Sequence, residues 1–373
     1  MKRIIILTVT ISVFFTGCIE FVDNSKRSNP WDPLGAFAWT TVASGATPQA
    51  GSMLAAQCVG GDVYVAFKEA SGDTVCGKIN TLGWTKTGGS ILIWPTESIG
   101  IALAINTTSS RPVVLYSVNP LLEGFVREYD GSSWQTSGNF APCHNDKIRV
   151  AVSPVSNKKA YVTCRFTGVT LKVTRTNSQS DLGSPAIFAE STPTDIAIVA
   201  GTVTGDAYVA YTLPSAVGVQ RCAGSGDNTG TWGALGASTN IAGAAAYISM
   251  AVDSAENIYV AYQDQSQGNK AVVRKFNGTS WSTLGTTASE GAAAWISIAV
   301  DKDNVPHLAF SDGTRDNKLT VVRYDNGIWA KYGYGISSSA ATEIILLGSR
   351  TSTTFYVAFC DASAGGKITV LKK

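Results

Sequence analysis

Four acidic residues recur at one position of a repeated pattern in the chain. Glu69 lies in FKEASGD, Asp264 in YQDQSQG, Asp312 in FSDGTRD and Asp361 in FCDASAG. A ring of carboxylates binds cations or sugar hydroxyls, because its oxygens accept hydrogen bonds and coordinate hard metal ions. An aspartate at such a position also caps its own turn through backbone N–H groups. The four residues are therefore candidate ligand contacts, and turn formation is the alternative.

Two aromatic residues occupy a second repeated position. Tyr247 and Trp295 each follow the letters GAAA and precede ISMAV or ISIAV, a run that predicts a buried strand. An aromatic ring at an exposed strand end stacks on the apolar face of a sugar, whereas a buried ring packs between neighbouring sheets. Tyr247 and Trp295 are the aromatic candidates for ligand binding, and packing is the alternative.

Other chemistries have few residues to support them. The chain has two histidines, His144 and His307, and no Cys/His cluster at the spacing of a zinc site. His307 takes a position that tyrosine fills in most other copies of the pattern, which predicts a buried core residue. We therefore expect no catalytic residue, no metal, no cofactor and no enzymatic activity.

The amino-acid composition limits the classes of molecule that the protein can bind. Charged residues make up 15% of the chain and the formal net charge is +2, whereas about 25% is typical of globular domains. Nucleic-acid binding needs a basic face, so we expect none. Beyond Cys18, six cysteines are scattered through apolar runs, which predicts mostly buried thiols with at most one bonded pair.

A hydrophobic segment recurs seven times and sets the architecture. Its copies begin at Tyr64, Val113, Tyr161, Tyr208, Tyr259, His307 and Tyr356, with spacings of 47 to 51 residues. Each copy follows an apolar run and a polar turn, and precedes a third strand, an Asn-Gly or Asp-Gly turn and usually a tryptophan. Four antiparallel strands per unit of this length predict an all-β, seven-bladed β-propeller.

The two ends of the repeat series fit together. The seventh unit has no tryptophan after its third strand, whereas Trp39 in FAWTTVA has the phase of a fourth strand. We therefore predict that an N-terminal strand completes the last blade and closes the ring, which removes open sheet edges. The third unit lacks its tryptophan, so its outer strand should be short or irregular.

The first residues predict export. Lys2 and Arg3 precede an apolar run that ends in Phe15-Thr16-Gly17-Cys18. This pattern resembles the lipobox of bacterial lipoproteins, which implies removal of residues 1–17, lipidation of Cys18 and attachment to the cell envelope, at the outer membrane or cell surface. An ordinary secretory signal is the alternative. Residues 18–36 would then form a tether and residues 37–373 the propeller.

One segment resembles a known blade element. SGDNTGTW, from Ser225 to Trp232, is similar to the Asp-box of sialidases, with its glycine one place late. The resemblance to sialidase-like and lectin-like bacterial propellers implies a fold and not an activity. We expect a binding or scaffold propeller for a protein partner at the cell envelope. The alternative is a lectin-like propeller that binds glycans, and a sialidase-like glycoside hydrolase is favoured less.

Overall fold

The computed structural model describes most of the chain from Trp39 to Lys373. Residues 1–38 lie outside it, and so do Cys18 and its predicted tether. The described residues are 39–43, 52–59, 62–69, 71–80, 83–89, 91, 98–106, 109–118, 123–140, 148–153, 159–165, 171–177, 181–182, 186–187, 193–223, 231–238, 240–348 and 353–373.

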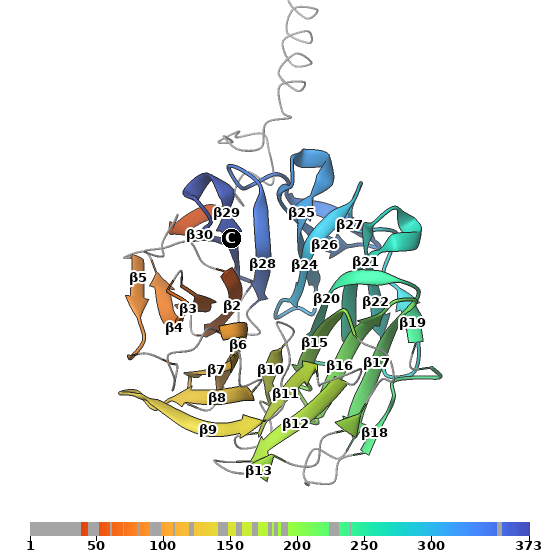
Figure 1. Cartoon of the computed structure of the whole chain (residues 1–373). Helices are drawn as coiled ribbons and strands as arrows, with labels where there is room; N and C mark the ends of the chain where they lie inside the picture. Colours follow the sequence, from red (N-terminus) through yellow and green to blue (C-terminus); the bar gives the residue numbers. More distant parts are fainter. Residues whose placement is uncertain are drawn as a thin grey trace, which may run out of the picture.

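The described strands form seven antiparallel sheets around a central axis (Figure 1). From the inner to the outer strand, the first three sheets are β2 (Ser52–Val59), β3 (Asp62–Lys68), β4 (Thr74–Asn80) and β5 (Gly83–Lys86); β6 (Ser98–Asn106), β7 (Arg111–Val118), β8 (Glu123–Tyr129) and β9 (Trp134–Phe140); and β10 (Arg149–Val152), β11 (Lys159–Arg165), β12 (Leu171–Asn177) and β13 (Asp181–Leu182), with β14 (Ala186–Ile187) also on β12.

The remaining four sheets repeat the same order. They are β15 (Asp195–Ala200), β16 (Ala207–Leu213), β17 (Ala216–Ala223) and β18 (Thr231–Ala234), with β19 (Asn240–Ala242) also on β17; β20 (Ala245–Val252), β21 (Ile258–Asp264), β22 (Lys270–Phe276) and β23 (Trp281–Thr283); β24 (Ala293–Val300), β25 (Pro306–Asp312), β26 (Lys318–Asp325) and β27 (Ile328–Gly333); and β28 (Ala341–Gly348), β29 (Phe355–Asp361), β30 (Lys367–Lys372) and β1 (Thr40–Ala43).

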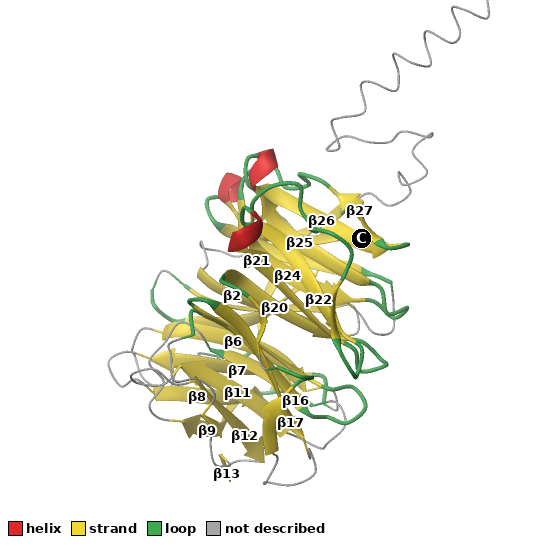
Figure 2. Cartoon of the chain, turned by 90° about the vertical axis from the view of Figure 1, so that its right-hand side faces the viewer, coloured by secondary structure: helices red, strands yellow, loops and turns green. Residues whose placement is uncertain are grey.

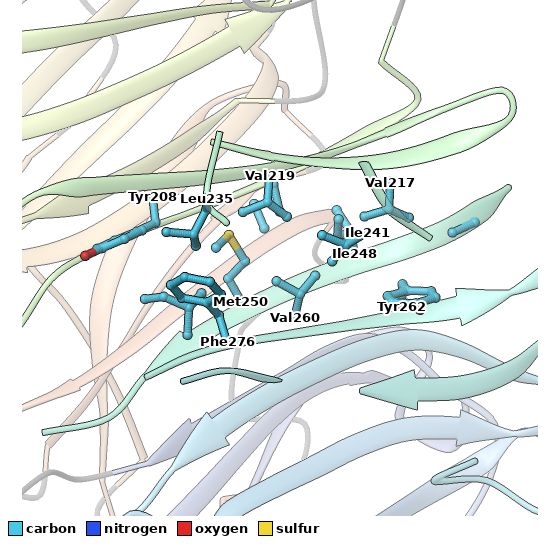
Figure 3. Packing of buried hydrophobic residues seen from close by; sticks show 14 of the residues in the cluster. Tyr208, Val217, Val219, Leu235, Ile241, Ile248, Met250, Val260, Tyr262 and Phe276 are labelled. Atoms are coloured by element: carbon cyan, nitrogen blue, oxygen red, sulfur yellow. The ribbon is translucent and has the colours of Figure 1, made fainter. Parts of the chain in front are cut away.

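The hydrophobic core lies between successive sheets. Figure 3 shows Val219 and Leu235 of one sheet meeting Met250 and Phe276 of the next. A second strand such as β21 is covered on both faces and is almost entirely buried, whereas the outer strand β23 is largely exposed. This explains why the second strands read as continuous apolar runs: a strand sandwiched between sheets has no solvent face.

The prediction of an all-β propeller with four-stranded antiparallel blades is confirmed, but the predicted number of seven blades is corrected to six blades with a continuous outer strand. Among the described residues, six sheets have a continuous outer strand of at least three residues. In the sheet of β10–β14 the described part of the outer position consists of the two-residue strands β13 and β14. The sequence around them contains Gly183 and Pro185 and lacks the blade tryptophan. Proline cannot donate a ladder hydrogen bond, and glycine weakens a strand, so these residue types disfavour a longer outer strand.

The two ends of the chain meet in one sheet, as the tryptophan phase predicted. β1 pairs antiparallel with β30, with Thr40 opposite Lys372 and Thr41 opposite Leu371. The inner strands contact one another in the order β2, β6, β10, β15, β20, β24 and β28, and β28 contacts β2. The N-terminal strand therefore completes the sheet that the C-terminal strands begin, and it closes the ring.

Short helical turns and thiols complete the description. Three 3-10 helices, η3 (Gln265–Gln267), η4 (Gly313–Arg315) and η5 (Ala362–Ala364), lie together on one side of the molecule (Figure 2). Among the described residues, no helix has the length and apolar character needed to cross a membrane.

The four described cysteine side chains are thiols. Cys76, Cys222 and Cys360 are buried, as expected, and Cys58 is partly buried.

Candidate functional site

Four inner strands begin with the same backbone irregularity. In β2, β20, β24 and β28, two residues stand opposite one residue of the next strand, which is a β-bulge. In β20, β24 and β28 the first residue of the pair is Tyr247, Trp295 or Glu343, with φ of 52°, 52° and 51°. A bulky residue in the left-handed region is strained by about 1–3 kcal/mol, and such strain tends to cluster at functional sites. The three strained bulges therefore mark these strand starts as a candidate site.

The strained residues line a central cavity. It has a volume of about 790 Å³, and the inner strands of all seven sheets contribute to its wall. Because every blade has the same topology, the starts of β20, β24 and β28 lie at the same end of this channel. Tyr247, Trp295 and Glu343 thus surround one mouth of the cavity.

Tyr247 and Trp295 form an aromatic pair at this mouth. Their ring centroids lie 5.5 Å apart and the ring planes are inclined by 51°. Tyr247 also packs against the core cluster between its sheet and the next. The Trp295 side chain keeps 38% of its surface exposed. Trp295 is therefore not a core residue, and its ring remains available to a ligand.

Two carboxylates stand on either side of this pair in the ring of blades. Asp195, at the start of β15, accepts a hydrogen bond from the backbone N–H of Ile248 at 3.1 Å. Glu343 accepts one from the backbone N–H of Leu54 in β2. Each acid therefore reaches the inner strand of the next blade, which holds both carboxylates at the wall of the cavity.

One cation completes the set. Arg149, the first residue of β10, forms an ion pair with Asp195 at 3.4 Å. We call Arg149, Asp195, Tyr247, Trp295 and Glu343 the mouth cluster. Its members come from five consecutive blades, and all five line the cavity.

The sequence prediction included the aromatic members of this cluster and missed the charged ones. A signal was present: Asp195, Tyr247, Trp295 and Glu343 each precede an isoleucine at the start of an inner strand. Aligning that position across the repeats would have identified both acids. The sequence alone does not show that this position lines the channel, or that it lies in a bulge in β20, β24 and β28.

The three repeated aspartates have a different role from the one proposed for a ring of ligands. Asp264, Asp312 and Asp361 are 8%, 1% and 3% exposed. Each caps the 3-10 helix that follows, accepting a hydrogen bond from the backbone N–H two residues on. Their carboxylates thus serve their own turns, in agreement with the alternative stated above.

The partners of these aspartates account for both carboxylate oxygens. Asp312 also accepts hydrogen bonds from Arg315 at 2.7 Å and Thr320 at 2.9 Å. Burial works to raise the pKa of Asp264, but hydrogen bonds from Ser266 and Gln267 outweigh it and hold that pKa below its ordinary value. The mouth cluster therefore does not include these aspartates.

Glu69 lies at the matching end of β3, in a turn without a described 3-10 helix. Its backbone N–H donates to the carbonyl oxygen of Asp73 at 2.8 Å, and its own carbonyl accepts from Gly72 at 2.9 Å. Glu69 does not line the central cavity. Its ligand-binding role remains a prediction from the sequence.

The fold is shared with carbohydrate-active proteins of known structure. An α-L-arabinanase of Penicillium chrysogenum, complexed with arabinobiose, matches with a TM-score of 0.53 and 9% identity over 90% of this chain and 97% of its own. A GH93 α-L-arabinofuranosidase of Fusarium graminearum, also with arabinobiose, matches with a TM-score of 0.50 and 10% identity over 90% and 96%. A fucose-specific lectin from Aleuria aurantia matches with a TM-score of 0.50 and 15% identity over 76% and 96%.

At these identities the likeness concerns the fold alone. No protein-family model matches the chain, and no curated protein sequence matches it either. The expected lectin-like propeller fold is confirmed at this level. The prediction that the protein is not an enzyme is overturned, because glycoside hydrolases stand among the proteins that share the fold. The fold accommodates both binding and catalysis.

Proposed function

We propose that the protein binds a carbohydrate at the mouth cluster. The observation that carries the proposal is the exposed, strained Trp295 beside Tyr247 at the mouth of a cavity. A sugar ring has an apolar C–H face that packs on an aromatic ring, and a rim of hydroxyls that donate to carboxylates. Tyr247 and Trp295 would supply the first contact, and Asp195 and Glu343 the second.

The strain at three equivalent positions supports a functional origin. Glycine or asparagine would adopt this left-handed backbone at lower cost. The blade itself therefore does not need a bulky residue at this position. Tyr247, Trp295 and Glu343 have the wrong side chains for this backbone and the right ones for contacting a ligand. Packing alone does not account for Trp295, since its ring is more than one-third exposed.

The fold comparisons support carbohydrate binding over the protein scaffold that the sequence favoured. Two of the similar structures hold arabinobiose, and the third is a fucose-specific lectin. A protein interface would typically need a broad patch with several aromatic or apolar anchors. Away from the mouth, the exposed large apolar side chains in the described part of the chain are Val203 and Ile328, at 61% and 64%, and they are single residues.

The N-terminal sequence adds a location to the proposal. Export and a lipid anchor at Cys18 would hold the propeller at the cell envelope, where its mouth could reach glycans outside the membrane. Residues 1–38 lie outside the described part of the chain, so this part of the proposal is tested separately below.

A glycan array tests the binding proposal. It should carry arabino-oligosaccharides, fucosylated glycans and common plant, fungal and bacterial saccharides. Wild-type protein is compared with Trp295→Ala and with Ile328→Ala, which removes another exposed apolar side chain away from the mouth. We expect binding to at least one glycan class, about a tenfold or greater loss in Trp295→Ala, and no change in the control.

The outcomes separate the parts of the proposal. No binding by a protein with an intact melting transition would remove carbohydrate binding. Equal binding by wild type and Trp295→Ala would place the site elsewhere. The same bound glycans are then incubated with the protein and the newly formed reducing ends are measured, which determines whether binding leads to hydrolysis.

A further inference from the structure

The charges around the aromatic pair are unequal. The charged residues among those lining the cavity are Arg149, Asp195 and Glu343, so one negative charge is in excess within the described part of the chain. Arg149 is already paired with Asp195. No described salt bridge involves Glu343, whose observed contacts are the backbone N–H of Leu54 and the thiol of Cys360.

The excess charge lies next to the proposed stacking surface. Tyr247, Trp295 and Glu343 occupy equivalent bulge positions on the adjacent strands β20, β24 and β28. A sugar stacked on the aromatic pair would therefore have Glu343 on one side and Asp195 on the other. The faces of aromatic rings are also electronegative and attract cations.

We infer that the site selects its sugar by charge, preferring amino sugars over neutral ones and rejecting acidic ones, with Glu343 as the specificity-determining residue. This inference rests on the proposed carbohydrate binding. A carboxylate on the ligand would face the like charge of Glu343, whereas an ammonium group would meet that carboxylate and two aromatic faces. One unit charge at contact distance near a protein surface changes affinity by about tenfold or more.

The inference distinguishes this chain from the sialidase resemblance noted in its sequence. A site for an acidic sugar needs arginines aimed at the ligand carboxylate. Here the described mouth supplies one arginine, and its guanidinium is paired with Asp195. Arg221 and Arg315 are paired with Asp206 and Asp312 and do not line the cavity.

The test uses saccharides that differ only in charge. An array carries β-linked glucose, glucosamine and glucuronic acid, and the matching sets of galactose and mannose configuration. In the set that binds best, we expect the order amino, neutral, acidic, with about tenfold between the amino and acidic members. Glu343→Gln keeps the shape of the side chain and the acceptor oxygen for Leu54. It should reduce the logarithm of the affinity ratio between the amino and acidic members by at least half.

The results identify which idea fails. Equal or tighter binding of the acidic member, or an unchanged order in Glu343→Gln, would overturn the charge inference while leaving carbohydrate binding intact. Failure of every saccharide to bind a folded protein would remove both.

A second measurement needs no glycan and reads the sign of the local field. The fluorescence of Trp295 is obtained as the difference between wild type and Trp295→Phe, and is quenched with caesium or iodide. Each quenching constant is divided by its value for free N-acetyltryptophanamide, because iodide is intrinsically the stronger quencher. A negative mouth concentrates cations, so this ratio should be higher for caesium than for iodide, and Glu343→Gln should reduce the difference. An iodide ratio equal to or above the caesium ratio would overturn the inference.

Discussion

The indole N–H of Trp39 donates a hydrogen bond to the carbonyl oxygen of Tyr332 at 3.1 Å, across a separation of 293 residues. The same contact joins other neighbouring blades: Trp134 donates to Thr87, Trp281 to Leu235 and Trp329 to Leu284. Each tryptophan ties its outer strand to the outer region of the preceding blade. Trp39 makes this contact for the blade that contains both chain ends, so the ring is closed by the same device that joins its other blades.

Deleting residues 37–42 should destabilise the whole propeller cooperatively. The deletion removes most of β1 and Trp39, and it leaves the edge of β30 unpaired. The point variant Trp39→Ala should cost about 2–4 kcal/mol of unfolding free energy, because it removes a half-buried ring and its hydrogen bond. Thermal and urea unfolding measure both, with Ile328→Ala as the control. An unchanged melting transition in the deletion variant would show that the ring does not need β1.

Trp295→Asn should separate stability from binding. Asparagine tolerates the left-handed backbone better than tryptophan, so the unfolding free energy should stay level or rise by about 1 kcal/mol. Glycan binding should be lost because the stacking surface is gone. Trp329→Asn is the matched contrast: it removes the contact with Leu284 and should lower stability while leaving binding unchanged. A strong destabilisation by Trp295→Asn would mean that the Trp295 ring is structural.

His307 should make the protein sensitive to mild acid. Burial lowers the pKa of His307 to about 3, and the charges of Arg323 and Lys373 add to the shift, although the carbonyl of Val305 opposes it. In the unfolded chain, His307 takes up a proton near pH 6.5, whereas in the folded protein it stays neutral at that pH. The stability from neutral His307 is therefore complete above about pH 6.5 and declines as pH falls toward 3, by a few kcal/mol in total.

His307→Phe should flatten this part of the stability curve. The ring centroid of His307 lies 4.7 Å from that of Tyr332 and 4.0 Å from that of Phe355, so a phenyl ring fits the same apolar surroundings. The measurement is the unfolding free energy of both proteins at several pH values between 4 and 8. A constant difference between the two curves would contradict the assignment to His307.

Cys18→Ser should release the protein from membranes. If Cys18 carries lipid, wild-type protein from a bacterial host partitions into the detergent phase and incorporates labelled fatty acid. The serine variant should do neither and should remain in the aqueous phase, while its propeller keeps the same melting temperature. Detergent partitioning that is equal in both proteins would refute the anchor.

The repeat made the blades predictable because each unit carries its own strand pattern and turn signals. Tyr247 and Trp295 could be identified from the sequence in the same way, since they precede inner strands in two nearly identical segments. The role of Asp312 could not be predicted from the sequence, because an aspartate that caps a turn and one that faces a ligand have the same sequence pattern after a strand. Only the positions of Thr314 and Thr320 distinguish these alternatives.

By itself, the sequence determined the all-β class, the stacking of sheets and the closure of the ring by Trp39. These follow from hydrophobic periodicity and from contacts that recur at a constant spacing, and both can be read along a chain. Tertiary structure alone decided that Asp195 and Glu343 join Tyr247 and Trp295 at one mouth. Their meeting depends on the closed ring of inner strands, and on backbone N–H groups donated by the neighbouring blade. Such contacts join positions in different blades, so no local pattern encodes them.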